Sequence, residues 1–196
     1  MSKTVEFYFD VGSPTTYLAY TQLPGICEQT GSQLIYKPML LGGVFKATGN
    51  ASPAMIPAKG RYMFQDLDRY AGRYGVPLKI NPHFPINTLM LMRAVTGVQL
   101  RHPERFKTFI DCLFTALWVE GKNLNDPATV AAVLMQNGFD PNQVLALTAD
   151  EEVKAALKDN TDKAIQRGVF GAPSMFVGDQ LFFGQDRLDF VIKALS

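Results

Sequence analysis

The feature that most constrains the fold is a short strand that turns directly into a helix near the start of the chain. Residues 4 to 9 alternate apolar and polar side chains, the pattern of a half-buried strand. Ser13 then precedes Pro14, and this pair is typical of a helix start, because serine can accept a hydrogen bond from a first-turn amide and proline has no amide to leave unpaired. Residues 33 to 39 read as a second strand. The opening therefore predicts a β-α-β unit.

Between about residue 62 and residue 167, strand signals give way to helix signals. Residues 62 to 74 form a helical run that ends at Gly75, and a long segment that begins at Pro103 ends at Gly121. Further helix starts are marked by capping residues and prolines at Asn87, Asp126-Pro127 and Asp140-Pro141. This stretch is predicted to be mostly helical.

The last quarter of the chain returns to strands. Residues 174 to 177 and 180 to 183 flank Gly178-Asp179, a linker suited to a tight hairpin, and a final helix is expected over residues 186 to 195. The order predicts an α/β protein in which β-α-β and β-β-α halves are interrupted by an all-helical insertion. The sheet domain is assigned to residues 1–62 and 155–196, and the helical insertion domain to residues 63–154.

Composition excludes several functional classes. The chain has 196 residues, 47% of them hydrophobic and 19% charged, which is typical of a globular protein with a sizeable core. Its 19 basic and 18 acidic residues give a net charge of +1, and no basic block marks a nucleic-acid footprint. No apolar run reaches membrane-spanning length, and the N-terminus enters a strand without a signal-peptide core. The expected location is cytoplasmic.

The cysteines and histidines indicate neither a disulfide framework nor a metal site. Cys27 and Cys112 lie far apart and outside any Cys-x-x-Cys pairing, so each is expected to be a small buried apolar residue. His83 and His102 are isolated, and nothing has the spacing of metal ligands. No metal is predicted.

Polar chemistry is concentrated at two segments far apart in the sequence. One is the turn that carries Ser13, and the other is Gly171-Ala172-Pro173, where a proline leads directly into a strand. A proline at a strand entrance is normally a liability, and Pro173 could be an edge-strand proline or an ordinary trans turn residue. The order of the elements, which resembles that of a thioredoxin-like protein, favours a cis bond before Pro173 instead. Ser13 has a simpler role as an N-cap alone, which remains open.

The order of motifs resembles a thioredoxin-fold family that contains kappa-class glutathione transferases and 2-hydroxychromene-2-carboxylate isomerases. Nearly the whole chain takes part in the resemblance, with serine where a redox cysteine would stand. Beyond the two segments above, the matching motifs are Pro38-Met39-Leu40-Leu41-Gly42-Gly43, Gly49-Asn50, Pro53-Ala54-Met55-Ile56-Pro57 with Lys59-Gly60, and Phe183-Gly184-Gln185-Asp186-Arg187.

The resemblance implies glutathione as the cofactor, bound between the sheet domain and the helical insertion with its thiol beside Ser13. It also implies that the backbone of Ala172, before cis-Pro173, pairs with the cysteinyl part of glutathione as an added strand would. The chemistry would follow from Ser13 donating a hydrogen bond that favours the thiolate over the thiol, whose ordinary pKa is about 8.5. Ser13 then acts as donor, not nucleophile.

The remaining glutathione contacts are also implied by the resemblance. Gln185 and Asp186 would hold the γ-glutamyl end, and Asn50 and Lys59 the rest. Simpler readings stay open, since Asp186 suits the first turn of a helix, Asn50 suits a turn, and Lys59 can be a solvated charge. The family often has an aromatic residue after Ser-Pro, where this chain has Thr15, and a shorter side chain at the position of Gln185.

The family implies a glutathione-dependent isomerase that acts on an aromatic-degradation intermediate, with a kappa-like glutathione transferase or peroxidase as the alternative. A homodimer and a small aromatic or electrophilic substrate are implied in the same way, with no nucleic acid or membrane partner. A thiol-disulfide oxidoreductase would need a thiolate at the turn, which Ser13 cannot supply. A binding module that has lost catalysis is a further alternative.

Overall fold

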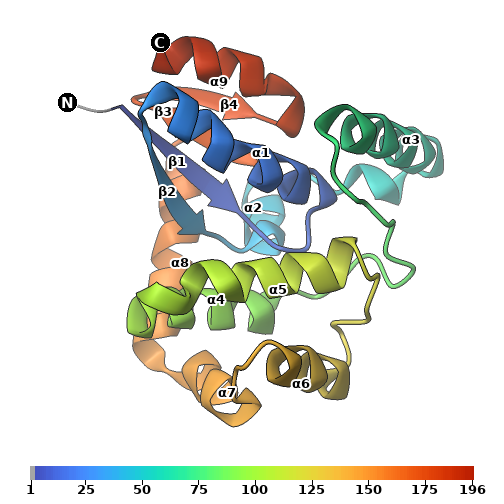
Figure 1. The fold of residues 1–196 in the computed structure, drawn as a ribbon, viewed down its shortest axis with the longest axis vertical. Coiled ribbons are helices and arrows are strands. Elements are labelled where there is room, and N and C mark those ends of the chain that lie inside the picture. Colours follow the sequence, from blue (N-terminus) through green and yellow to red (C-terminus); the bar gives the residue numbers. More distant parts are fainter. Residues whose placement is uncertain (1–2) are drawn as a thin grey trace.

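A mixed sheet of four strands forms the centre of the protein, shown here by a computed structural model that describes residues 3–196 (Figure 1). β1 (Thr4–Phe9) lies between β2 (Gln33–Pro38), which is parallel to it, and β3 (Ser174–Val177), which is antiparallel. β4 (Gln180–Phe183) pairs with β3, so the strand order is β2-β1-β3-β4. The two predicted halves of the sheet domain are therefore joined through β1 and β3.

The first helix is the crossover that two parallel strands require. α1 (Pro14–Thr30) begins as predicted, with the Ser13 side chain accepting a hydrogen bond from the Thr16 amide and Pro14 at the first helical position. It ends at Gly31, whose φ of 62° is the left-handed conformation that glycine adopts most readily.

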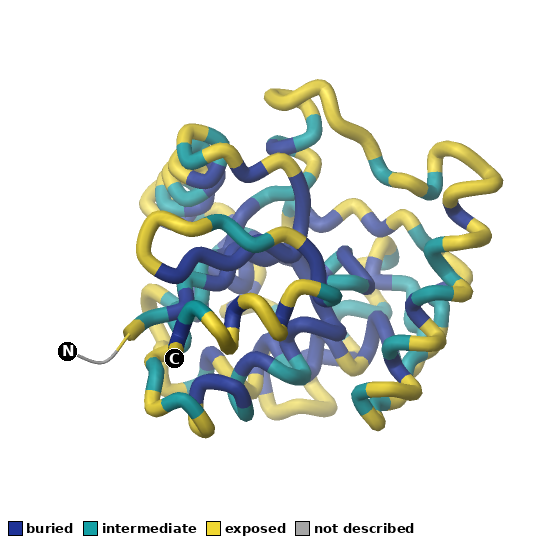
Figure 2. The backbone as a smooth tube through the Cα atoms, turned by 90° about the horizontal axis from the view of Figure 1, so that it is seen from above, coloured by how far each residue is buried: buried dark blue, intermediate teal, exposed yellow. Residues whose placement is uncertain are grey.

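The alternation of side chains along the strands builds two apolar layers. Phe7, Phe9 and Met175 face the larger core, which is covered by α1 and by α9 (Leu188–Leu195). Tyr8 and Phe176 face the smaller core, which is covered by α2 (Leu41–Thr48) and α8 (Glu151–Gln166). Figure 2 shows buried segments of the backbone at the centre of the molecule, with exposed segments around them.

The other helices lie mainly in the predicted helical stretch. They are α3 (Pro57–Tyr74), α4 (Leu89–Arg101), α5 (Phe106–Trp118), α6 (Pro127–Gln136) and α7 (Pro141–Ala149), with 3-10 turns at Pro53–Met55, Pro103–Arg105 and Gln185–Arg187. The caps predicted at Asp126 and Asp140 are confirmed, since each accepts a hydrogen bond from a first-turn amide. In Figure 1, α4 to α7 gather on one side of the sheet.

The helical stretch and the sheet share one core. The Phe114 ring on α5 lies 4.5 Å from the Tyr20 ring and 6.4 Å from the Phe9 ring, measured between centroids. The boundaries predicted after residues 62 and 154 fall inside α3 and α8. The apolar contact between the sheet and the helical stretch is extensive. Their division into two domains stays a prediction.

Some element boundaries differ from the prediction. α2 was not predicted, because two glycines in Leu41–Thr48 weaken its helical signal, and it is held by packing against α8 in the smaller core. α3 starts at Pro57 rather than residue 62, and α5 ends at Trp118 rather than at Gly121. Among residues 3–196, no helix combines the length and apolar character needed to cross a membrane.

Candidate functional site

The turn before α1 is held by its own backbone and by the first turn of the helix. The Ser13 amide donates to the Asp10 carbonyl at 3.1 Å, and the Ser13 Oγ accepts from the Thr16 amide at 3.1 Å. Ser13 is 5% exposed, so few water molecules can compete for its hydroxyl. The N-cap role is confirmed, and it uses only an acceptor position of the hydroxyl, which leaves the hydroxyl hydrogen available to a further acceptor.

The predicted partner segment lies directly against this turn. The Ala172–Pro173 bond is cis, as predicted. The Ala172 carbonyl oxygen lies 3.1 Å from the Thr15 Oγ1 and 3.4 Å from the Ser13 Oγ, and the two hydroxyl oxygens are 2.9 Å apart. Residues that are 159 positions apart in the sequence thus meet at the N-terminus of α1.

Two backbone amides at this point have no acceptor among residues 3–196. The Thr16 and Tyr17 amides both donate to Ser13, and Pro14 has no amide hydrogen. The Thr15 amide is therefore the first-turn donor that remains without an acceptor. The amide of Ala172 is also unpaired within the described chain. Free amides at the positive end of a helix favour an anionic ligand. The site can therefore accept a negatively charged group and an extended peptide backbone.

Asp10 supports the turn, although nothing in the sequence around it marks it as a residue of the site. It is 1% exposed, with its Oδ1 bonded to the Gly12 amide and its Oδ2 to the Leu41 amide and the Thr88 hydroxyl, all at 2.9 Å. Burial raises the pKa of the Asp10 carboxyl above its ordinary value, although the three hydrogen bonds act in the opposite direction. Asp10 thus joins the turn to the first residues of α2 and α4.

Three of the other predicted site residues lie next to the same segment. The Asn50 Nδ2 donates to the Phe170 carbonyl at 2.8 Å. Asn50 follows α2 and Phe170 lies two residues before Ala172, so this bond brings the end of α2 next to the Ala172 segment. Gln185 and Asp186 follow Gly184, whose amide donates to the Pro173 carbonyl at 3.0 Å. The Gln185 carbonyl accepts from the Tyr74 hydroxyl at 2.6 Å, so α3 is joined to this side of the site.

The side chains of these residues differ in how far they are already engaged. Gln185 is 6% exposed, and its side-chain amide makes no hydrogen bond within residues 3–196. Asp186 is paired with Arg187 at 2.5 Å. Lys59 is exposed near the start of α3, and no contact in the described chain ties it to Ser13 or Ala172. The structure therefore gathers the predicted residues around Pro173, with the exception of Lys59.

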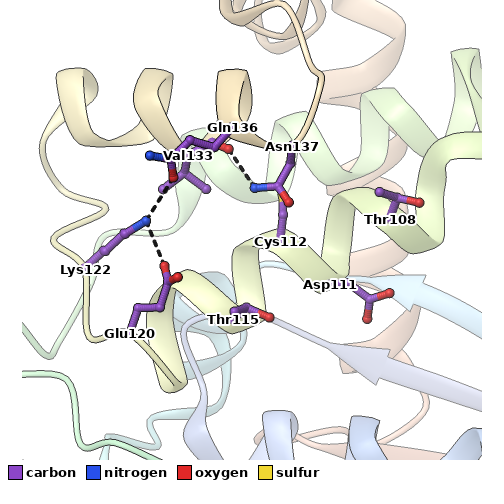
Figure 3. A pocket seen from close by; sticks show the side chains of 9 residues that line it. All are labelled: Thr108, Asp111, Cys112, Thr115, Glu120, Lys122, Val133, Gln136 and Asn137. Carbon is purple, nitrogen blue, oxygen red and sulfur yellow. Dashed lines mark hydrogen bonds and ion pairs between the residues drawn. The ribbon is translucent and has the colours of Figure 1, made fainter.

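A cavity of about 220 Å³ lies elsewhere, between α5 and α6 (Figure 3). Its charged groups are already satisfied, because Lys122 pairs with Glu120 at 2.8 Å and donates to Gln136 at 3.3 Å. Burial, with the nearby Asp111, raises the pKa of the Cys112 thiol in its wall to about 12. That thiol is therefore not a nucleophile near neutral pH. None of the predicted site residues lines this cavity.

The cysteines and the acidic side chains offer no other chemical centre in the described chain. Cys27 and Cys112 are both buried and unpaired with each other, as predicted. Among residues 3–196, no three His, Cys, Asp or Glu side chains are grouped so that they could hold a metal ion. The turn at Ser13 with the segment before Pro173 is therefore the best candidate site.

Comparison with known proteins identifies the family of the chain. The model of the DsbA-like thioredoxin domain matches residues 4–196. A 2-hydroxychromene-2-carboxylate isomerase of Sphingobium xenophagum is 32% identical over 194 residues, covering 97% of each chain. Glutathione S-transferase kappa 1 of Homo sapiens is 28% identical over 212 residues, covering 100% of this chain and 92% of the relative.

A solved structure gives the same result in three dimensions. The structure of a 2-hydroxychromene-2-carboxylate isomerase superimposes with a TM-score of 0.85 at 29% identity, covering 98% of this chain and 94% of that one. The chain therefore belongs to the family of DsbA-like thioredoxin domains that includes the 2-hydroxychromene-2-carboxylate isomerases and the kappa-class glutathione transferases.

Proposed function

We propose that the protein is a glutathione-dependent isomerase of the 2-hydroxychromene-2-carboxylate isomerase type, which acts on an intermediate of aromatic-compound degradation. The observation that carries the proposal is the position of Ser13, whose hydroxyl lies at the N-terminus of α1 within 3.4 Å of the carbonyl before cis-Pro173. Full-length similarity to isomerases of this name supports the choice of reaction.

The free polar groups of the site fit glutathione, a tripeptide with a thiol. The unpaired Ala172 amide offers a donor to an extended peptide backbone, as an edge strand does. The unpaired Thr15 amide and the Ser13 hydroxyl lie together at the helix N-terminus, where an anionic sulfur is favoured. Asn50, Lys59, Pro173, Gln185 and Asp186 are proposed as further contacts of the peptide.

Ser13 would act as a hydrogen-bond donor that lowers the pKa of the bound thiol. Moving a thiol pKa of about 8.5 down by about two units needs roughly 2.7 kcal/mol of preference for the anion. One charge-assisted hydrogen bond supplies about 1.5–3 kcal/mol, and the helix N-terminus adds to it. The Ser13 hydrogen bond, the free Thr15 amide and the helix dipole can therefore together supply the free energy that this pKa shift requires.

Bound glutathione would supply a thiol that adds reversibly to an unsaturated substrate, so that rotation about the former double bond becomes easy before elimination restores it. The chain's own contribution is to hold this sulfur at Ser13, favour its deprotonated form, and exclude bulk water from a site in which Ser13 is 5% exposed. Serine does not lose its own proton in this scheme.

The second candidate is a kappa-class glutathione transferase or peroxidase, favoured by full-length similarity to the human and Caenorhabditis elegans kappa enzymes. Activation of the thiol is common to both candidates, so the two differ only in the second substrate. A disulfide oxidoreductase is a weaker alternative, because Ser13 stands at the turn and the pKa of the Cys112 thiol is raised to about 12 by burial. The remaining alternative, a binding module that has lost catalysis, would show no turnover.

Other properties are proposed on the family likeness, the composition of the chain and the order of its elements. The protein is proposed to be a cytoplasmic homodimer with a small aromatic or electrophilic substrate and without nucleic-acid or membrane partners. A sheet domain of residues 1–62 and 155–196 with a helical insertion of residues 63–154 is proposed as its domain organisation.

The deciding experiment measures isomerisation of 2-hydroxychromene-2-carboxylate with and without added glutathione. The proposal expects turnover that requires glutathione and that falls strongly in Ser13→Ala, while the folded state is retained. Conjugation of glutathione to a test electrophile without isomerisation would favour the transferase instead. No thermal shift across millimolar glutathione would contradict both, because a ligand at about 100 times its Kd adds roughly 2.7 kcal/mol to stability.

The placement of Lys59 needs its own test, since no contact in the described chain links it to Ser13. If Lys59 holds glutathione, Lys59→Ala should weaken glutathione binding several-fold in calorimetry and leave the unfolding temperature unchanged, because the side chain is exposed. Lys193→Ala, an exposed lysine on α9, serves as the matched control. Equal affinities for the two variants would remove Lys59 from the site.

A further inference from the structure

Three oxygen atoms at the N-terminus of α1 lie within 3.4 Å of one another. The Ser13 Oγ and the Thr15 Oγ1 are 2.9 Å apart, and both hydroxyls reach the Ala172 carbonyl oxygen, at 3.4 Å and 3.1 Å respectively. The Ser13 Oγ also accepts from the Thr16 amide. These three oxygens share only two hydroxyl hydrogens, so only a few hydrogen-bond arrangements are possible.

The distances decide which hydroxyl serves the carbonyl. Thr15 is the nearer donor to Ala172, whereas the Ser13 contact at 3.4 Å is long for an O–H···O hydrogen bond. The arrangement with the best geometry therefore has Thr15 donating to Ala172 and Ser13 donating to the Thr15 Oγ1. The Ser13 hydrogen then rests on a neutral hydroxyl, which is a weaker acceptor than an anion.

We propose that Thr15 is a positioning residue that directs the hydroxyl hydrogen of Ser13 to the sulfur of bound glutathione. This inference rests on the proposed function. Thr15 occupies the Ala172 carbonyl, which is the strongest competing acceptor near Ser13, and it offers Ser13 only a weak resting partner. When a thiolate arrives, the Ser13 hydrogen turns from the Thr15 oxygen to the sulfur, and no bond to the backbone has to be broken.

The carbonyl can serve Thr15 and the ligand together. A carbonyl oxygen has two lone pairs, so the Ala172 oxygen can keep the Thr15 bond and accept an amide of the extended peptide in place of the long Ser13 contact. Ala172 is 8% exposed and Ser13 is 5% exposed, so little water reaches either of them beside the half-buried Thr15 hydroxyl. Without that hydroxyl, Ser13 is drawn towards the carbonyl.

The test compares the apparent pKa of the bound glutathione thiol in four single variants and one double variant, measured by the ultraviolet absorbance of the thiolate during a pH titration. Thr15→Val removes the hydroxyl at nearly constant shape, and Thr15→Ser keeps it. Thr16→Val is the matched control, because the Thr16 hydroxyl is buried one residue further along α1 and has no hydrogen-bond partner in the described chain. Ser13→Ala reports on the proposed function itself.

We expect Thr15→Val to raise the thiol pKa by about half a unit to one unit, the range that one neutral hydrogen bond supplies. Thr15→Ser and Thr16→Val should keep the wild-type value. Because Thr15 acts through Ser13, adding Thr15→Val to Ser13→Ala should raise the pKa no further. Thermal unfolding of each variant shows whether it is folded, and the Thr15→Ser rescue separates positioning from packing.

Two results would overturn the inference while the proposed function stands. One is an unchanged thiol pKa in Thr15→Val beside a raised pKa in Ser13→Ala. The other is a further rise on adding Thr15→Val to Ser13→Ala, which would mean that Thr15 touches the sulfur directly. An unchanged pKa in Ser13→Ala, or no binding of glutathione by the wild type, would reject the proposed function and the role of Thr15 with it.

Discussion

The indole nitrogen of Trp118 donates a hydrogen bond to the Val11 carbonyl oxygen at 2.8 Å. Trp118 is the last residue of α5, Val11 lies two residues before Ser13, and both are fully buried. The helical stretch is therefore joined to the turn of the candidate site by a hydrogen bond that water cannot replace.

Loss of this bond should destabilise the fold. Trp118→Phe keeps an aromatic ring but leaves the Val11 carbonyl buried without its donor, so the free energy of unfolding should fall by about 1–3 kcal/mol. Urea denaturation followed by circular dichroism measures this change. A variant as stable as the wild type would mean that the hydrogen bond contributes nothing to stability.

Gly12 is required by the close approach of Thr88, the residue before α4. A Cβ at position 12 would lie 2.5 Å from the Thr88 Cγ2, so Gly12→Ala should cost about 1–3 kcal/mol of stability through overpacking. Thr88→Ser removes that methyl group and keeps the hydroxyl that donates to Asp10. The double variant should recover most of the loss in a denaturation cycle, and purely additive losses would contradict the contact.

Asp10 should give the stability a measurable pH dependence. Burial raises the pKa of its carboxyl, so the native state holds this proton more tightly than the unfolded state, whose carboxyl pKa is about 3.9. The stabilisation that the protonated Asp10 carboxyl contributes is present in full below the unfolded-state pKa of about 3.9, and it is lost as pH rises through the raised native pKa. The stability of the wild type relative to Asp10→Asn should therefore fall over this window. A relative stability that increased with pH would reverse the assignment.

Thr16 carries a buried hydroxyl with no hydrogen-bond partner among residues 3–196. Thr16→Val replaces it with a methyl group of similar shape and should raise the free energy of unfolding by about 1 kcal/mol. Thr21→Val is the control on the same helix, because the Thr21 hydroxyl donates to the Leu18 carbonyl at 2.7 Å. Equal effects of the two substitutions in urea denaturation would argue against an unpartnered hydroxyl at Thr16.

The parts of the site that could be predicted carry their own local signals. Ser13 before Pro14 marks the helix start, and a proline at a strand entrance marks Pro173, so each was found from a few neighbouring residues. The hairpin at Gly178-Asp179 was found in the same way and is confirmed by the pairing of β3 with β4. The family resemblance then placed the two segments in one site.

The parts that could not be predicted depend on contacts between distant segments. Asp10 is significant because the Leu41 amide and the Thr88 hydroxyl converge on it, and nothing next to Asp10 in the sequence indicates either. The helical segment predicted from Pro103 to Gly121 contains α5, but nothing in its sequence indicates the bond from Trp118 to Val11. The role proposed for Thr15 likewise depends on the carbonyl of Ala172, far along the chain.

The most direct test of the central claim is a pH titration of the glutathione thiolate bound to the wild type and to Ser13→Ala, followed by ultraviolet absorbance. If the Ser13 hydroxyl donates to the sulfur, its removal should raise the thiol pKa by about one to two units, the equivalent of one charge-assisted hydrogen bond. A thiol pKa that is the same in both proteins would contradict the account.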